Sequence, residues 1–291
     1  MNNIKTFDNF HKINIFKYIE RNDVESVKNY IDSSHDLNIK NRGSDTILIY
    51  SIRYNTIGII ELLLNAGVDI NKQNGDGDTA LILSVFYGRN KIFKLLLKYG
   101  ADVNKRNNNG DTALINAVYS NNVKIVKLLL DAGVDISKQN GDGNTALILA
   151  SCYGNIEIVK LLLKYGANFN EQNNNGDSAL IYAASHNKIE IVKLLLDAGA
   201  ADINKQNEYG YTVLVWAAYK NNREIVEILL DHGADEFILN NRNKSFYDYL
   251  SYENKKYFLQ KYPTSVYNAI SNWYEKSFTE FVKEFNIKIK K

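Results

Sequence analysis

Short apolar segments alternate with polar segments rich in Asn and Gly along this chain of 291 residues, and the alternation is periodic. A Thr or Ser precedes each apolar segment, at Thr46, Thr79, Thr112, Thr145, Ser178 and Thr212. A glycine follows at the same spacing, at Gly67, Gly100, Gly133, Gly166, Gly199 and Gly233. The spacing is 33 residues, with one step of 34 that places an extra residue at Ala200 or Ala201. A fixed period of this length is typical of a repeat array.

Each period is predicted to contain two helices and a loop. The Thr or Ser suits a helix N-cap, because its hydroxyl can accept hydrogen bonds from the first free backbone N–H groups. A short apolar helix follows, as over residues 80–87, and a second helix comes after a turn, as over residues 91–99. The glycine suits the C′ position, where a left-handed conformation is needed. Asn-Gly and Asp-Gly steps then predict a tight, hairpin-like loop.

The second helix of each period is too apolar to stand alone in water. It must bury one side against its partner helix and the other against the next period. The predicted fold class is therefore all-α, an α-solenoid of stacked helix–turn–helix units with hairpin loops.

The repeated segments resemble ankyrin repeats. The family pattern G-x-T-P-L-H-x-A-A…I-V-x-L-L-L-x-x-G-A-D-x-N is similar to GDTALINAV…IVKLLLDAGVDIS, which begins at Gly110, and to GDSALIYAA…IVKLLLDAGAADIN, which begins at Gly176. The resemblance implies six full repeats over residues 41–240, between a degenerate N-terminal capping repeat over 1–40 and a C-terminal capping repeat over 241–262. The apolar spacing after Pro263 predicts a helical tail over residues 263–291.

The repeats depart from the family in one systematic way. None carries the T-P-L-H tetrad; the corresponding residues are TILI, TALI, TALI, TALI, SALI and TVLV. Replacing His with Ile or Val is expected to remove a polar link between neighbouring loops and to substitute apolar packing. The Asn of the Asp-x-Asn turn, at Asn71, Asn104, Asn170 and Asn204, is expected to cap the local backbone.

Composition restricts the class of partner. Lys and Arg number 35 against 33 Asp and Glu, a balance that gives no electrostatic reason to expect nucleic acid or a membrane surface as the partner. One Cys argues against a disulfide framework and a Cys-rich zinc module. No run approaches the roughly 18 apolar residues of a membrane span, and the N-terminus has no secretory signal pattern. We expect a cytoplasmic monomer.

The amino-acid usage suggests an AT-rich genome, because 40 Asn accompany a single Pro. Together with the near-identical repeats, this usage resembles ankyrin-repeat proteins of intracellular bacteria and large DNA viruses. Many of those act on host proteins, so the resemblance implies delivery into a host cell as a further hypothesis.

Cofactor and metal motifs are weak. The G-x-G-x-x-A segments at Gly75 and Gly141 match a dinucleotide fingerprint, but they fall in loop tips instead of following a buried parallel strand. No two of the four histidines, at His11, His35, His186 and His232, have metal-ligand spacing on one helix. We expect no cofactor and no metal.

One pair of residues could have supported nucleophilic catalysis. Cys152 and His186 end the first helices of adjacent repeats. Packed helices lie about 8–10 Å apart, which predicts that the thiol and the imidazole are too distant for a nucleophile–base pair. We therefore expect no catalytic residue and no enzymatic activity.

The seventh and eighth residues after each Thr or Ser end the first helix, which in ankyrin repeats lines the binding groove. These positions are rich in aromatic side chains, which provide large contact areas with few rotamers to immobilise. With two tyrosines of the adjacent loop, the candidate binding residues are Arg53, Tyr54, Phe86, Tyr87, Tyr119, Tyr153, His186, Tyr209, Tyr211, Tyr219 and Lys220. The alternative is that these rings cover the seams between repeats.

The resemblance implies a non-enzymatic module that binds a protein partner on its concave face, with a host-directed effector role as one hypothesis. The alternative function is an adaptor that recruits a bound protein to ubiquitin-ligase or other machinery through its C-terminal tail.

Overall fold

The structure, a computed structural model, describes residues 15–33, 36–199 and 202–262. The chain divides into two compact units, of which unit 1 ends at Ala146 and unit 2 begins at Leu147. The extra residue predicted at Ala200 or Ala201 and the predicted tail over 263–291 lie outside the described residues.

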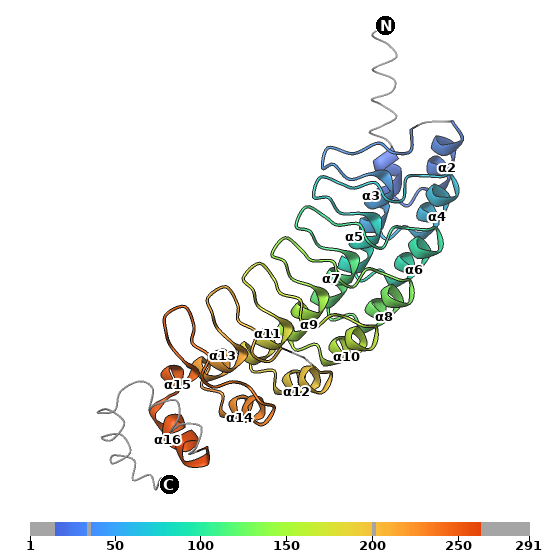
Figure 1. Cartoon of the computed structure of the whole chain (residues 1–291). Coiled ribbons are helices and arrows are strands. Elements are labelled where there is room, and N and C mark those ends of the chain that lie inside the picture. The colour runs from blue at the N-terminus through green and yellow to red at the C-terminus, as the bar shows by residue number, and fades with distance from the viewer. Residues whose placement is uncertain (1–14, 34–35, 200–201, 263–291) are drawn as a thin grey trace. The chain divides into compact units, whose positions relative to one another are not determined.

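Unit 1 is built from helix pairs. Residues 15–20 are helical and precede α2 (Val24–Asp32). The following pairs are α3 (Ile47–Tyr54) with α4 (Ile57–Asn65), α5 (Ala80–Phe86) with α6 (Asn90–Lys98), and α7 (Ala113–Tyr119) with α8 (Val123–Asp131). Helix α3 packs on α5, and α5 on α7, so the first helices form one layer and the second helices another. The loops project from the first-helix side (Figure 1).

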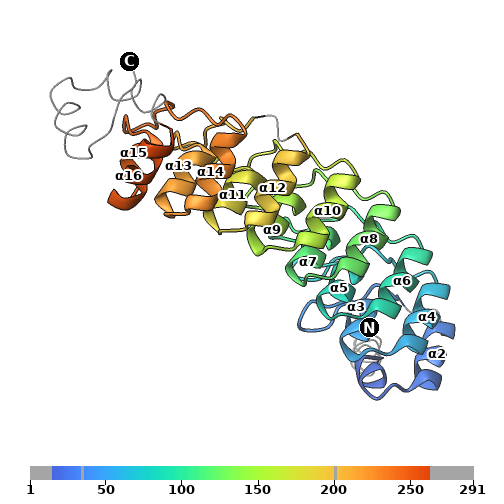
Figure 2. The same ribbon diagram turned by 90° about the horizontal axis from the view of Figure 1, so that it is seen from below.

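Unit 2 repeats the same arrangement. Its helices are α9 (Ala146–Tyr153), α10 (Ile156–Lys164), α11 (Ala179–Ser185), α12 (Ile189–Asp197), α13 (Val213–Tyr219), α14 (Arg223–Asp231), α15 (Phe246–Tyr249) and α16 (Tyr252–Lys261). Here α11 packs on α13 and α13 on α15, while α10, α12 and α14 follow one another in the second row (Figure 2). The all-α prediction is confirmed: the described ranges contain helices joined by loops, and their β pairing is limited to the isolated bridges Lys40–Thr46 and Gln172–Ser178.

The helix boundaries predicted at the Thr, Ser and Gly marker residues are confirmed. Thr46 Oγ1 accepts from the Ile49 N–H at 3.2 Å, and Thr112 Oγ1 accepts from the Ile115 N–H at 3.3 Å. The glycines after the second helices have φ between 74° and 83°, the left-handed region that a side chain disfavours. The Thr and Gly markers thus begin the first helix and end the second helix of each repeat.

The core lies between the two helix layers. In α8 the side chains of Ile125, Val126 and Leu129 are wholly buried, and in α7 those of Ala117 and Val118 are too. No helix in the described part combines the length and apolar character that crossing a membrane requires.

Candidate functional site

One Asn in each loop folds the loop around its carboxamide. Asn74 Oδ1 accepts from the backbone N–H groups of Asp76 at 3.0 Å and Asp78 at 2.9 Å. The same pair of bonds, to the second and fourth residues onward, recurs at Asn107, Asn140, Asn173, Asn207 and Asn240. These loops therefore present a fixed surface beside the first helices.

The same Asn links its loop to the preceding one. Asn74 Nδ2 donates to Asp45 Oδ1 at 3.1 Å, and Asn107 Nδ2 donates to Asp78 Oδ1 at 2.9 Å. In unit 2, Asn207 Nδ2 donates to Asp177 Oδ1 at 2.8 Å. Ile or Val stands where the family has His, and the Asn–Asp bond supplies a polar link between loops that was not predicted from the sequence.

A second link corrects the role predicted for the Asp-x-Asn turn. Asn71 Oδ1 accepts from the backbone N–H of Asp102, in the next repeat, at 2.8 Å. Asn104 and Asn204 accept in the same way from Asp135 and Asp235. The local cap is made instead by the Asp of the turn, since Asp69 Oδ1 accepts from the Asn71 N–H at 3.0 Å.

The loop tips of neighbouring repeats touch through their backbones. The Gly141 N–H donates to the Asn109 carbonyl at 2.7 Å. Gly110 has φ +79°, and a Cβ built on it would lie 2.6 Å from Gly141 N. Glycine at this tip is therefore required both by conformation and by space.

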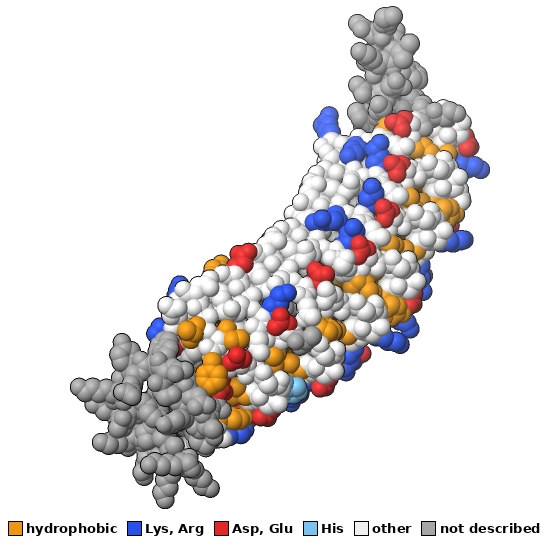
Figure 3. Space-filling view, viewed as in Figure 1, with side chains coloured by type: hydrophobic (Ala, Val, Ile, Leu, Met, Phe, Trp, Pro, Cys, Tyr) orange, Lys and Arg blue, Asp and Glu red, His pale blue; other side chains and the backbone are white. Residues whose placement is uncertain are grey.

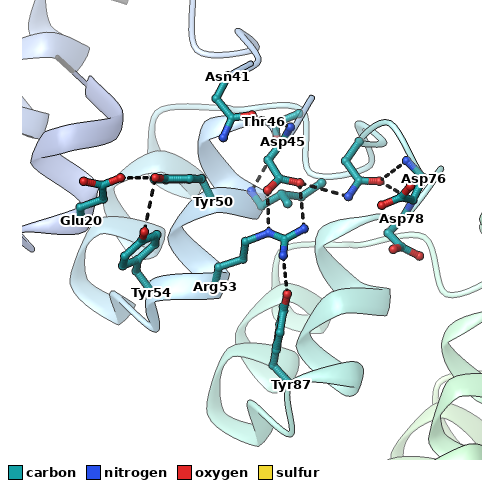
Figure 4. Close-up of polar contacts among 12 residues, drawn as sticks. Glu20, Asn41, Asp45, Thr46, Tyr50, Arg53, Tyr54, Asp76, Asp78 and Tyr87 are labelled. Atoms are coloured by element: carbon teal, nitrogen blue, oxygen red, sulfur yellow. Dashed lines mark hydrogen bonds and ion pairs between the residues drawn. The ribbon is translucent and has the colours of Figure 1, made fainter. Parts of the chain in front are cut away.

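The candidate residues of unit 1 have different environments. Phe86 is 67% exposed, and Tyr54 and Tyr119 are also exposed. Arg53 and Tyr87 instead bond to each other: Arg53 Nη1 donates to Tyr87 Oη at 2.6 Å, and Arg53 Nε donates to Asp45 Oδ2 at 2.6 Å (Figure 4). The bond to Asp45 raises the pKa of the guanidinium. Tyr87 thus fits the seam interpretation, because its hydroxyl bridges adjacent repeats.

The candidate residues of unit 2 centre on an aromatic cluster. The Tyr211 ring lies 5.6 Å from that of Trp216 and 5.8 Å from that of Tyr249. Tyr219, 60% exposed, lies 5.9 Å from Trp216. Figure 3 shows hydrophobic side chains gathered at this C-terminal end of unit 2. The other candidates of unit 2 are also at the surface. Tyr153, Tyr209 and His186 are exposed, and the His186 ring stacks on that of Tyr182. The Nζ of Lys220 lies 5.7 Å from the centre of the Tyr219 ring.

Trp216 and Tyr249 were not among the candidates predicted from the sequence. Both stand four residues after the Thr or Ser that begins their helix, one turn before the candidate positions. Because residues three or four apart share a helix face, this spacing was the signal that could have found them.

The thiol of Cys152 is closer to His186 than predicted. Its Sγ lies 3.7 Å from His186 Nε2. The spacing between the two helices did not determine this distance, because both side chains lie at helix ends and extend toward the seam between the repeats. Burial raises the pKa of Cys152, which favours the neutral thiol over the nucleophilic thiolate. Among the described residues no group of three or more His, Cys, Asp and Glu side chains is placed to hold a metal ion.

Comparisons with known proteins agree on the repeat. The family model for ankyrin repeats (three copies) matches residues 15–107, 105–173 and 165–240. A similar solved structure is the ankyrin repeat domain of Bcl-3, described as a unique member of the IkappaB protein family. It aligns with a TM-score of 0.67 at 28% identity and covers 74% of this chain and 97% of that domain. No protein of curated function matches this chain.

Proposed function

This chain belongs to the ankyrin-repeat family, whose members generally bind other proteins, and we propose that it binds a protein partner across its loops and first helices. In this proposal the chain has no catalytic activity and uses no cofactor. The partner would lie on the face that is concave in ankyrin domains.

The distribution of exposed rings carries the proposal. Of the twelve large hydrophobic residues that are exposed in the described part, six are Tyr54, Phe86, Tyr119, Tyr153, Tyr209 and Tyr219. We call these six residues the aromatic stripe. In unit 1, Tyr54, Phe86 and Tyr119 each end a first helix, and in unit 2 Tyr153 and Tyr219 do the same. Exposed apolar side chains that gather on a unit in this way indicate an interaction site, whereas isolated ones do not.

The hydrogen-bonded loops support binding because they limit the entropy lost on association. Asn74 and Asn207 each hold a loop through two accepted N–H bonds and one donated bond. A surface fixed before the partner arrives has less conformational freedom to lose. In this proposal the side chains of Arg53, Tyr87 and Tyr211 support the binding surface, since their polar groups form hydrogen bonds within the chain.

We also propose that the chain is a cytoplasmic monomer. The most specific form of the proposed function is an effector role on host proteins. The adaptor alternative depends on residues 263–291. Deleting these residues distinguishes the two functions. A binding module would keep both its partner and its effect on that partner, whereas an adaptor would keep the partner and lose the effect.

Partner capture with matched variants tests the proposal. We expect a variant with Phe86, Tyr119 and Tyr153 changed to Ser to lose proteins that the parent enriches from cell lysate. The control changes Tyr165 and Tyr252 to Ser, because both are exposed, Tyr165 at the C-cap of α10 and Tyr252 at the start of α16. Equal capture by the stripe variant and the parent, at unchanged circular dichroism, would place the binding surface elsewhere.

A further inference from the structure

A row of carboxylates runs along the loops of unit 1. Asp45, Asp78 and Asp111 each directly precede the Thr that caps a first helix. Asp45 and Asp78 each also accept a hydrogen bond from the Asn of the following loop, whereas the corresponding amide of Asn140 donates to the Tyr119 hydroxyl at 3.2 Å. These three groups therefore occupy equivalent places in consecutive repeats.

The first member of the row has a cation from its own chain. Arg53 binds Asp45 through Nε at 2.6 Å and Nη2 at 3.3 Å. Its third nitrogen, Nη1, reaches the Tyr87 hydroxyl at 2.6 Å (Figure 4). The chain thus shows which group fits this place: a planar guanidinium that bridges the carboxylate and an aromatic hydroxyl.

The third member, Asp111, lacks such a cation. The residue that corresponds to Arg53 in its repeat is Tyr119. Asp111 is 9% exposed, and its Oδ1 has no hydrogen-bond partner among the described residues. It lines an open hollow of about 440 Å³ together with Asn109, Tyr119, Asn140 and Asp142. A buried carboxylate oxygen without a donor is costly, so a site that keeps one is a candidate for a ligand that supplies it.

The charges around the hollow favour a cation. Burial raises the pKa of Asp111, and the nearby carboxylates of Asp142 and Asp78 raise it further. The Asn140 amide and Arg106 oppose the shift, but the Arg106 Nε donates to the Gly110 carbonyl at 3.0 Å. A positively charged donor in the hollow would offset the carboxylate repulsion and satisfy Oδ1.

We propose that the hollow at Asp111 receives an arginine side chain of the protein partner, held as Arg53 is held at Asp45. This inference rests on the proposed protein-binding function and adds the chemistry of one anchor. The guanidinium would donate to Asp111 and Asp142 and lie beside the Tyr119 ring. Arginine suits the place better than lysine, because its fork of donors reaches two acceptors at once.

A titration of the full chain with N-acetyl-L-argininamide, followed by amide chemical shifts in NMR, tests this proposal. We expect shifts at Asp111, Gly141 and Asp142, and much smaller ones with the citrulline analogue, which has the same shape but no charge. Asp111→Asn should raise the midpoint concentration at least about tenfold. The chain places Asn144 at the equivalent buried position, so this variant should keep its fold.

The matched control is Asp102→Asn. Asp102 is exposed and accepts from the Asn104 N–H, which a carboxamide oxygen can also do. This variant should bind argininamide as the parent does. Equal shifts with the citrulline compound, an unchanged midpoint in Asp111→Asn, or no shifts at all would overturn the arginine site. Those outcomes leave partner capture through the aromatic stripe intact, so the two proposals fail separately.

Discussion

The Asn74 carboxamide joins two neighbouring repeats, because its Nδ2 donates to Asp45 Oδ1 at 3.1 Å while its Oδ1 holds its own loop. Asn74 is buried, as is Asp45. Neighbouring loops of this chain are thus coupled by an Asn–Asp pair, while the first-helix position of the family's histidine holds an apolar residue such as Ile82.

Replacing Asn74 should test that coupling. Asn74→Ala leaves the N–H groups of Asp76 and Asp78 without their acceptor, and we expect a loss of about 1–3 kcal/mol in the free energy of unfolding. Urea denaturation followed by circular dichroism measures it. The control, Asn109→Ala, removes an exposed loop side chain and should change stability by less than about 0.5 kcal/mol. Equal effects of the two variants would mean that the carboxamide bonds contribute little.

Two glycines separate backbone strain from steric conflict. Gly133 has φ +74° and open space where a Cβ would lie, so Gly133→Ala should cost about 1–2 kcal/mol from conformation alone. Gly110 has a similar φ, but its Cβ would meet Gly141 N at 2.6 Å. Gly110→Ala should cost roughly 1–3 kcal/mol more. Chemical denaturation measures the free energy of unfolding of both variants. Equal losses would show that neighbouring loop tips can move apart without a loss of stability.

Leu129 tests the core between the helix layers. Its side chain is wholly buried, so Leu129→Ala should destabilise the chain by about 2–5 kcal/mol. Val123 begins the same helix and is 36% exposed, so Val123→Ala should cost far less. A denaturation midpoint that is the same for Leu129→Ala and the parent would contradict the packing described for α8.

The buried carboxylate of Asp111 should give a pH-dependent stability. Burial raises its folded-state pKa, so its contribution to stability is fully present below the unfolded value of about 3.9 and is lost as the pH rises through the folded value. Asp111→Asn should therefore be more stable than the parent near pH 7, and this gain should shrink in acid. Urea midpoints measured across this pH range check the sign. A variant less stable than the parent at neutral pH would show that the carboxylate stabilises the free protein.

Much of this fold follows from local sequence signals. The Thr and Ser markers predict N-caps, and Gly133 and its equivalents predict helix ends, because each depends on bonds within a few residues. The Asn74–Asp45 bond joins residues 29 positions apart, so it depends on how the repeats stack. The Cys152–His186 distance was mispredicted for the same reason: an interhelical spacing does not say where side chains at helix ends extend.

The binding role of the candidate residues stays a prediction, and the sequence indicated only part of their environment. The period identified the row of rings that includes Phe86, but it did not distinguish Phe86 from Tyr87, whose hydroxyl is bonded by Arg53. The Arg53–Tyr87 bond joins adjacent repeats, and the spacing within a single sequence does not report such bonds.

Site-specific photo-cross-linking tests the central claim most directly. A photoreactive phenylalanine analogue is placed at Phe86, at Tyr119 or, as the control, at Tyr165 on the second-helix layer. The proposed surface predicts covalent adducts with a partner protein from Phe86 and Tyr119 and none from Tyr165. Adducts from Tyr165 alone would contradict it and place the partner on the second helices.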